Sequence, residues 1–168
     1  MIALSFRSGS GAPGESEKRM SFPTPFHYQD PSSSDLCAYH ALVHFLYGSL
    51  SKPAFLSQAT TYYARELGME RADAKQLAEG GNDMALIKHI LRLRGHTESI
   101  TRQPTDKDLS YYNRILLALS KRSHFITMLK DNTGQWWDYD SVATEPWKIP
   151  DVGQFLTENP AYEYLLAK

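Results

Sequence analysis

The distribution of apolar residues divides the chain into a helical first half and a strand-forming second half, and this division limits the fold more than any other feature. Up to Gly95, apolar residues recur at helical spacing in segments that end at glycine. After Asn113, short apolar and aromatic runs are separated by polar turns, which is typical of strands. We therefore expect an α+β fold in which N-terminal helices pack on a C-terminal antiparallel sheet.

The helical half contains start and stop signals for four segments. The first helix follows a cap at Ser34 or Asp35 and stops at Gly48, so that Cys37 falls in its first turn. The second helix begins after Ser51 and ends at Gly68, and the third runs from Glu70 to Ala78. The fourth follows a cap at Asn82 and ends at Gly95. The strand half predicts strands over 114–119, 124–130 and 135–140, then a short helix over 152–156 and a closing strand over 162–166.

Length and composition favour one globular domain. The chain has 168 residues, of which 42% are hydrophobic, and this suits a single compact core. Residues 8–21 are rich in Gly, Ser, Glu, Lys and Pro and offer little to bury. We therefore expect a flexible leader over 1–21 and one domain over 22–168.

Charge and cysteine content argue against several classes of protein. With 18 Lys and Arg against 19 Asp and Glu, the net charge of -1 gives no general attraction to nucleic acid or to an anionic membrane. No apolar run approaches the length of a membrane span. Cys37 is the single cysteine, so no internal disulfide is possible. No secretory signal is recognisable, and we expect cytoplasmic action, in a host cytosol if the chain is a bacterial effector.

Cys37 is the first candidate for a reactive group. At the start of a helix, unpaired amides and the helix dipole create positive potential, which stabilises the nucleophilic thiolate. Residue statistics alone favour inert packing for a lone cysteine on an apolar helix. The nucleophile hypothesis also requires that the thiol lie at an accessible cleft. Both roles stay open at this point.

The turn Asp131-Asn132-Thr133-Gly134 sets which residues share a face of the surrounding hairpin. A two- or four-residue connection would place His124 and Asp140 on opposite faces. A three-residue loop with Gly134 as a left-handed bulge instead makes them diagonal neighbours on one face, roughly 7 to 8 Å apart. Asp140 can then orient the imidazole so that its other nitrogen exchanges a proton with a thiol. Asp138 lies on the same face and is the reserve candidate.

Acyl transfer to a thiol also needs hydrogen-bond donors for the tetrahedral oxyanion. The backbone amide of Cys37 is one expected donor, and the side-chain amide of Gln29 is the second candidate. The loop between the two residues must fold back to bring that amide beside the thiol.

His40 and His44 allow a different interpretation of the first helix. They have the i, i+4 separation of paired metal ligands, and Cys37 precedes them on the same helix. The glutamate of an HExxH motif is missing and no other ligand cluster accompanies them, so we predict no metal and no cofactor. We expect His40 to pack or hydrogen-bond near the site and His44 to lie at the surface or the edge of the core.

Three short blocks resemble the Josephin-type deubiquitinases, which are papain-like cysteine proteases. Leu36-Cys37-Ala38-Tyr39-His40-Ala41-Leu42 resembles the helix that carries the nucleophile of that family. Leu77-Ala78-Glu79-Gly80-Gly81 resembles the segment after its helical arm. His124-Phe125-Ile126-Thr127 and Gln135-Trp136-Trp137-Asp138-Tyr139-Asp140-Ser141 resemble its histidine strand and the strand of its third catalytic residue.

The resemblance implies a papain-like fold and a thiol isopeptidase that acts on ubiquitin or ubiquitin-like conjugates. It implies Cys37 as nucleophile, His124 as general base and acid, Asp140 as the residue that orients the histidine, and Gln29 as an oxyanion donor. The family often has asparagine in place of Asp140, and its glutamine lies closer to the cysteine than Gln29 does. No cofactor is implied, and we expect a monomer.

Two other functions are compatible with the same residues. The thioester could be passed to an amine or used in side-chain amide hydrolysis, as in transglutaminases, acyltransferases and deamidating effectors. Alternatively, the chain could keep a ubiquitin-binding groove while its thiol is misaligned, which would make it a catalytically weak binding module. These functions share one fold and one cysteine, so the sequence does not separate them.

Overall fold

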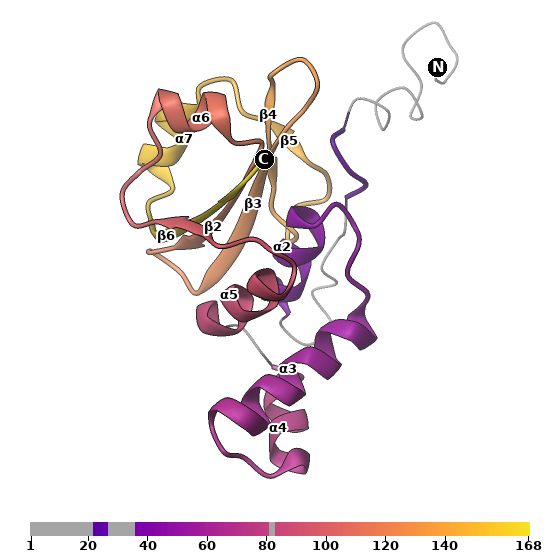
Figure 1. Cartoon of the computed structure of the whole chain (residues 1–168). Coiled ribbons are helices and arrows are strands. Elements are labelled where there is room, and N and C mark those ends of the chain that lie inside the picture. Colours follow the sequence, from indigo (N-terminus) through magenta and orange to yellow (C-terminus); the bar gives the residue numbers. More distant parts are fainter. Residues whose placement is uncertain (1–21, 27–35, 81–82) are drawn as a thin grey trace, which may run out of the picture.

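A six-stranded antiparallel sheet forms the centre of the part of the chain that the structure describes (Figure 1). This computed structural model describes residues 22–26, 36–80 and 83–168, so the expected leader over 1–21 lies outside it. The strands lie in the order β1 (Glu98–Ile100), β6 (Ala161–Ala167), β2 (Arg114–Leu119), β3 (His124–Lys130), β4 (Trp136–Tyr139) and β5 (Trp147–Lys148). Together with the helices, this sheet confirms the predicted α+β class.

Helices cover both faces of the sheet (Figure 1). They are α2 (Cys37–Phe45), α3 (Lys52–Glu66), α4 (Arg71–Ala78), α5 (Met84–Leu93), α6 (Asp106–Tyr111) and α7 (Val152–Glu158). One apolar core lies between α2, α5 and the sheet and includes Leu42 and Phe125. A second core lies on the opposite face and includes Ile126 and, from α7, Leu156. Helices α3 and α4 pack on each other as an arm that projects from the sheet (Figure 1).

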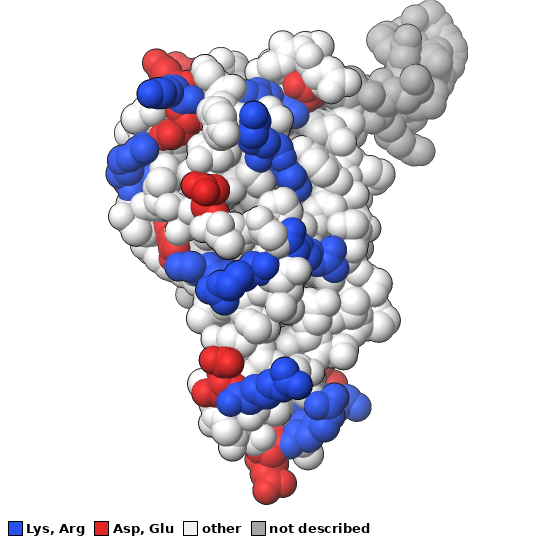
Figure 2. All heavy atoms as spheres, in the orientation of Figure 1, with Lys and Arg blue, Asp and Glu red and all other residues white. Residues whose placement is uncertain are grey.

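Side chains of both charges lie on the face drawn in Figure 2. Lys and Arg side chains form a row across the middle of this face, Asp and Glu side chains lie above and below it, and both kinds reach the end of the α3–α4 arm. This distribution agrees with the small formal net charge of -1. Among the helices of the described ranges, none is long and apolar enough to cross a lipid bilayer.

Side-chain caps mark the beginnings of four helices, α3, α5, α6 and α7. Helix α3 begins after Ser51 as expected, and the Ser51 hydroxyl caps it by accepting a hydrogen bond from the backbone N–H of Ala54 at 3.2 Å. Asn82, the expected cap of α5, lies outside the described residues, and the cap position belongs to Asp83 instead. The Oδ1 atom of Asp83 accepts a hydrogen bond from the N–H of Ala85 at 2.9 Å. A carboxylate is favoured at this position because the helix N-terminus is electropositive.

Strands β1 and β5 and helix α6 lack the apolar periodicity from which the other elements could be predicted. Strands β1 and β5 lie at the two edges of the sheet and contain no buried residue, so they lack the apolar alternation of a strand. Helix α6 begins with a capping box formed by Thr105 and Asp108 and is also without buried residues. None of the three contributes a residue to the candidate site described below.

Helix α2 is fixed to β3 by a buried hydrogen bond. The hydroxyl of Thr127 donates to the backbone carbonyl of Ala41 at 2.8 Å, and the Thr127 side chain is fully buried. The two elements also lie side by side in Figure 1. Because α2 begins at Cys37 and β3 begins at His124, this contact brings the first residues of both elements to the same end of the sheet.

The β3–β4 turn has the three-residue geometry that the sequence predicted. Asp131 and Gln135 pair across the hairpin, with the N–H of Asp131 donating to the carbonyl of Gln135 at 2.9 Å. The N–H of Gly134 donates to the carbonyl of Asp131 at 3.1 Å, and Gly134 has a φ of 88°. Gly134 is therefore the left-handed bulge residue, and the register pairs Thr127 with Tyr139.

The conformation of Gly134 leads to a stability prediction. Gly134→Ala should lower the free energy of unfolding by about 1–2 kcal/mol, because an L-residue is strained at positive φ. Gly80→Ala is the matched control, since nothing lies within 4 Å of the added Cβ and no positive φ opposes it; its effect should stay within about 0.5 kcal/mol. Urea unfolding measures both variants. Equal losses of stability would contradict the role of Gly134.

Candidate active site

The side chains of His124 and Asp140 meet at the open end of the β3–β4 hairpin. His124 is the first residue of β3, and Asp140 directly follows the last residue of β4. The Nε2 atom of His124 lies 2.6 Å from Oδ1 of Asp140. The predicted placement of these two residues on one face is therefore confirmed.

Arg122 holds the second oxygen of the Asp140 carboxylate. Its Nη2 atom donates to Oδ2 of Asp140 at 3.2 Å from the turn between β2 and β3. The backbone N–H of Val142 donates to Oδ1 at 3.3 Å. Sequence reasoning missed Arg122, because it lies in the turn before β3 and no periodic pattern assigns that turn to the face of His124. The carboxylate is thus held from three directions.

These contacts stabilise opposite charges on the two partners. Burial by itself raises the pKa of Asp140, but the hydrogen bond and the charge of His124 outweigh it and leave the pKa below its ordinary value. Burial likewise lowers the pKa of His124, but hydrogen bonds to Asp140 and Cys37 outweigh it and raise the pKa to about 9. At neutral pH His124 is therefore an imidazolium whose Nε2–H donates to the Asp140 carboxylate.

Cys37 lies beside His124 but has no exposed surface. Its side chain takes part in a hydrogen bond with His124. The residue has a relative exposure of 0% and belongs to the apolar core under α2. The expectation that the thiol lies at an accessible cleft is therefore not met in this conformation. A reaction at the sulfur requires side chains around it to move.

The start of α2 differs from the predicted capped start. Ser34 and Asp35, the expected caps, lie outside the described residues, and the N-cap position belongs to Leu36. Leu36 has no side-chain acceptor, so the N-cap side chain adds no negative charge to the helix N-terminus.

Asp138, the reserve candidate, has a different environment from Asp140. It lies in β4, paired with Met128 on one side and Trp147 on the other. Its buried Oδ1 atom has no hydrogen-bond partner within the described part of the chain. Burial, with help from the charge of Asp140, raises the pKa of Asp138 to about 7. Asp140 is therefore the carboxylate that contacts His124.

The two histidines of α2 occupy buried positions. His40 is nearly buried and its ring centroid lies 5.2 Å from that of Tyr39. His44 is 0% exposed and lies between the rings of Phe26 and Tyr139, at centroid distances of 5.3 and 5.0 Å. The expectation of a surface or core-edge position for His44 is therefore wrong. The described ranges contain no group of three or more His, Cys, Asp and Glu side chains that could hold a metal ion.

An open cleft of about 310 Å³ leads to His124 from outside. It lies between the β2–β3 turn and the start of β6, and its walls include Ser120, Lys121, Arg122, Ser123, His124 and Tyr162. Cys37 does not line it. The cleft thus borders His124 at a place where Cys37 is not among the lining residues.

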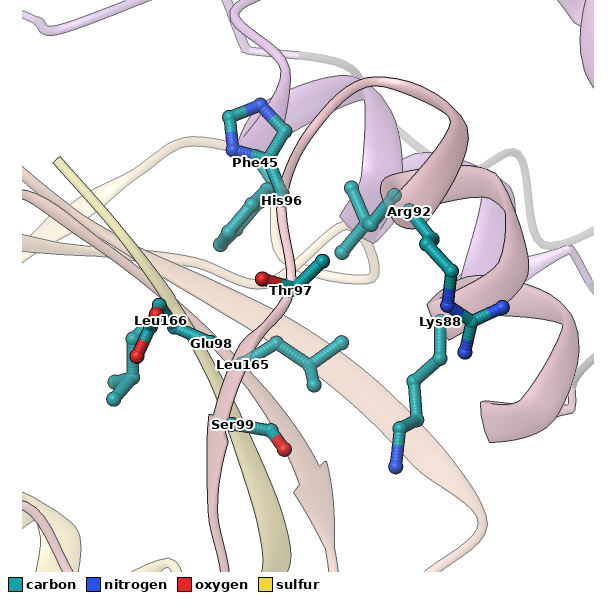
Figure 3. A pocket seen from close by; sticks show the side chains of 10 residues that line it. Phe45, Lys88, Arg92, His96, Thr97, Glu98, Ser99, Leu165 and Leu166 are labelled. Carbon is teal, nitrogen blue, oxygen red and sulfur yellow. The ribbon is translucent and has the colours of Figure 1, made fainter.

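A second hollow, between α5, β1 and β6, is unrelated to these residues (Figure 3). Lys88, Arg92, His96 and Glu98 lie around it, and Lys88 is paired with Glu163 at 2.6 Å. Its volume is only about 50 Å³, which is enough for one or two water molecules but not for a substrate side chain. The cleft at His124 is the better candidate for a substrate.

The contacts run from a thiol through an imidazole to a carboxylate, and such a chain can move a proton between a nucleophile and a leaving group. Gln29, the predicted oxyanion donor, lies outside the described residues. A comparison of the sequence with protein-family models and with curated proteins finds no match.

The charge state of His124 can be measured directly. In an NMR titration of the histidine rings, His124 should titrate above pH 8, and Asp140→Asn should lower its midpoint by more than one pH unit because the anionic partner is lost. His96 is the internal control, since burial and the nearby arginines Arg114 and Arg94 lower its pKa. A His124 midpoint near 6.5 would contradict the proposed contacts.

Replacement of Asp138 should stabilise the protein in a pH-dependent way, because its buried Oδ1 atom has no hydrogen-bond partner in the described ranges. Its folded-state pKa of about 7 lies above the unfolded-state value of about 4, so ionised Asp138 destabilises the fold increasingly from pH 4 to pH 7. Asp138→Asn should therefore gain about 2 kcal/mol more at pH 8 than at pH 5, relative to the parent. Asp140→Asn is the contrasting control, because its charge is stabilising, and it should lose stability at both pH values. Urea unfolding at the two pH values tests this, and a pH-independent effect of Asp138→Asn would refute it.

Proposed function

We propose that the chain is a papain-like cysteine hydrolase that cleaves isopeptide or peptide bonds after a ubiquitin or ubiquitin-like C-terminal tail. The observation that carries the proposal is the 2.6 Å contact between His124 and Asp140, with the thiol of Cys37 hydrogen-bonded to the same imidazole. In this proposal Cys37 is the nucleophile, His124 the general acid and base, and Asp140 the orienting carboxylate. Cytoplasmic conjugates are the expected substrates, and no cofactor takes part.

The protonation state of His124 supports this order of steps. If His124 is an imidazolium at neutral pH, the thiolate can attack the substrate carbonyl while the ring keeps the proton that the leaving amine will need. The tetrahedral intermediate then collapses, the C–N bond breaks, and His124 gives its proton to the departing amine. The neutral ring next takes a proton from water, and the resulting hydroxide attacks the thioester carbonyl. This releases the acyl group as a carboxylic acid and restores the thiolate of Cys37 beside the imidazolium of His124. The amide of Cys37 and the side chain of Gln29 are the proposed oxyanion donors.

The choice of ubiquitin as substrate rests on the resemblance to Josephin-type deubiquitinases. The resembling blocks contain Cys37, His124 and Asp140 in the order of that family. The papain-like assignment of the fold has the same basis, together with a helix that carries the cysteine against a sheet that carries the histidine. Transfer of the acyl group to another amine, or deamidation, would use the same first step.

The complete burial of Cys37 favours one second candidate, a catalytically weak ubiquitin-binding module. In a module of this kind the thiol would stay inaccessible in the presence of ubiquitin. In the proposed enzyme, substrate binding would uncover it. Alkylation of the free protein by iodoacetamide should be slow under both hypotheses, so the decision requires a substrate-like probe.

The deciding experiment uses ubiquitin that carries a C-terminal electrophile. The proposal predicts a one-to-one covalent adduct, and Cys37 is the only cysteine that can form it. Cys37→Ala should abolish the adduct, which is the control for reaction at other side chains. Non-covalent binding of ubiquitin without an adduct would establish the binding module and remove the proposed activity.

The roles of the other two residues are tested by turnover of a ubiquitin isopeptide substrate. His124→Ala should lower kcat/KM by at least about 100-fold with binding retained, because the leaving amine loses its acid. Asp140→Asn should keep about tenfold more activity than Asp140→Ala, since an amide oxygen can still accept the imidazole N–H. Urea unfolding of each variant verifies that it is folded. Equal activity of all three would contradict these roles.

A further inference from the structure

The cleft beside His124 lies where the leaving group of the proposed reaction must be. After attack, the acyl group is bonded to Cys37, while the departing amine takes its proton from His124. His124 lines the cleft and Cys37 does not. We propose that this cleft binds the leaving-group side of the substrate and selects an acidic residue next to the scissile amine. This inference rests on the proposed function and specifies the substrate class of the same site.

The charged side chains that line the cleft are cationic, while the nearby Asp140 carboxylate pairs with two of them, Arg122 and His124. Lys121 and Arg122 contribute cations from the β2–β3 turn, and none of the residues that line the cleft is acidic. Arg122 is paired with Asp140, whereas Lys121 has no ion pair with any residue in the described ranges. Lys121 is therefore the cation that can pair with a substrate carboxylate.

The uncharged walls suit a peptide segment. Ser120 and Ser123 line the cleft, and their hydroxyls can donate to a carboxylate or to a backbone carbonyl. Tyr162 lies at its edge with 53% of its surface exposed, so its ring offers an apolar face to the alkyl chain of a lysine. An acidic residue beside that lysine would then lie within reach of Lys121.

The same charges exclude a different occupant. A ubiquitin tail contains arginines, and these would be repelled by Lys121 if the tail occupied this cleft. The tail must therefore approach from the Cys37 side. This separates the two parts of the substrate, a basic acyl segment and an acidic leaving segment, on the two sides of His124.

The test measures binding without relying on catalysis. Two acetylated, amidated pentapeptides with a central lysine are titrated into the full chain, one with glutamate and one with glutamine on both sides of the lysine. Amide NMR shifts should change at residues 120–123 and at Tyr162. The glutamate peptide should bind about fivefold more tightly at low salt, and the preference should shrink as salt screens the charges. Equal affinities, or shifts confined to other regions, would overturn the proposal.

A charge-matched pair of variants locates the effect. Lys121→Gln should remove most of the preference for glutamate. Lys107→Gln is the control, because Lys107 is an exposed lysine of α6 outside the cleft, and it should leave the preference unchanged. Neither substitution touches a residue of the proposed triad. A preference that survives Lys121→Gln would overturn the assignment.

Hydrolysis separates this inference from the proposed function. Ubiquitin joined through an isopeptide bond to each of the two peptides should be cleaved with a kcat/KM ratio of about five in favour of the glutamate peptide. Cleavage of both at equal rates would sustain the hydrolase and overturn the acidic selectivity. Binding of the glutamate peptide at the cleft without any cleavage would sustain the anionic-peptide site and overturn the hydrolase.

Discussion

The hydrogen bond between His124 and Asp140 is the contact on which the candidate site depends. It exists because a three-residue turn sets the β3–β4 register and places both side chains on one face. Helix α2 reaches the same place because Thr127 fixes it to β3 by a buried hydrogen bond. The local geometry of one turn and the position of one helix thus determine whether a thiol, an imidazole and a carboxylate can act together.

Asp138 and Asp140, near the end of β4, show how strongly hydrogen-bond partners control the ionisation of a carboxyl group. Asp138 and Asp140 are two residues apart, and burial opposes the ionisation of both. Asp140 overcomes this with His124, Arg122 and a backbone amide as partners, whereas the buried Oδ1 of Asp138 has none among the described residues. Their pKa values consequently move in opposite directions. The ionisation state of each aspartate at this site therefore depends on its hydrogen bonds and neighbouring charges, since the two residues are of the same type.

The sequence was sufficient for features that local chemistry controls. The parity of the β3–β4 turn follows from Gly134, and helix α3 begins at a serine cap, so both could be predicted. Burial of His44 between Phe26 and Tyr139 could not, because it arises from segments far apart in the chain. Edge strands β1 and β5 bury nothing and leave no hydrophobic pattern. The contact of Arg122 likewise becomes visible only when two turns are placed together in space.

The burial of Cys37 has a consequence for the lifetime of the protein. Oxidation by peroxide needs direct access to the thiolate, and a sulfur without exposed surface is shielded from it. With no second cysteine in the chain, a sulfenic acid formed here would have no internal resolving thiol. While it is covered, the sulfur is therefore protected from irreversible oxidation.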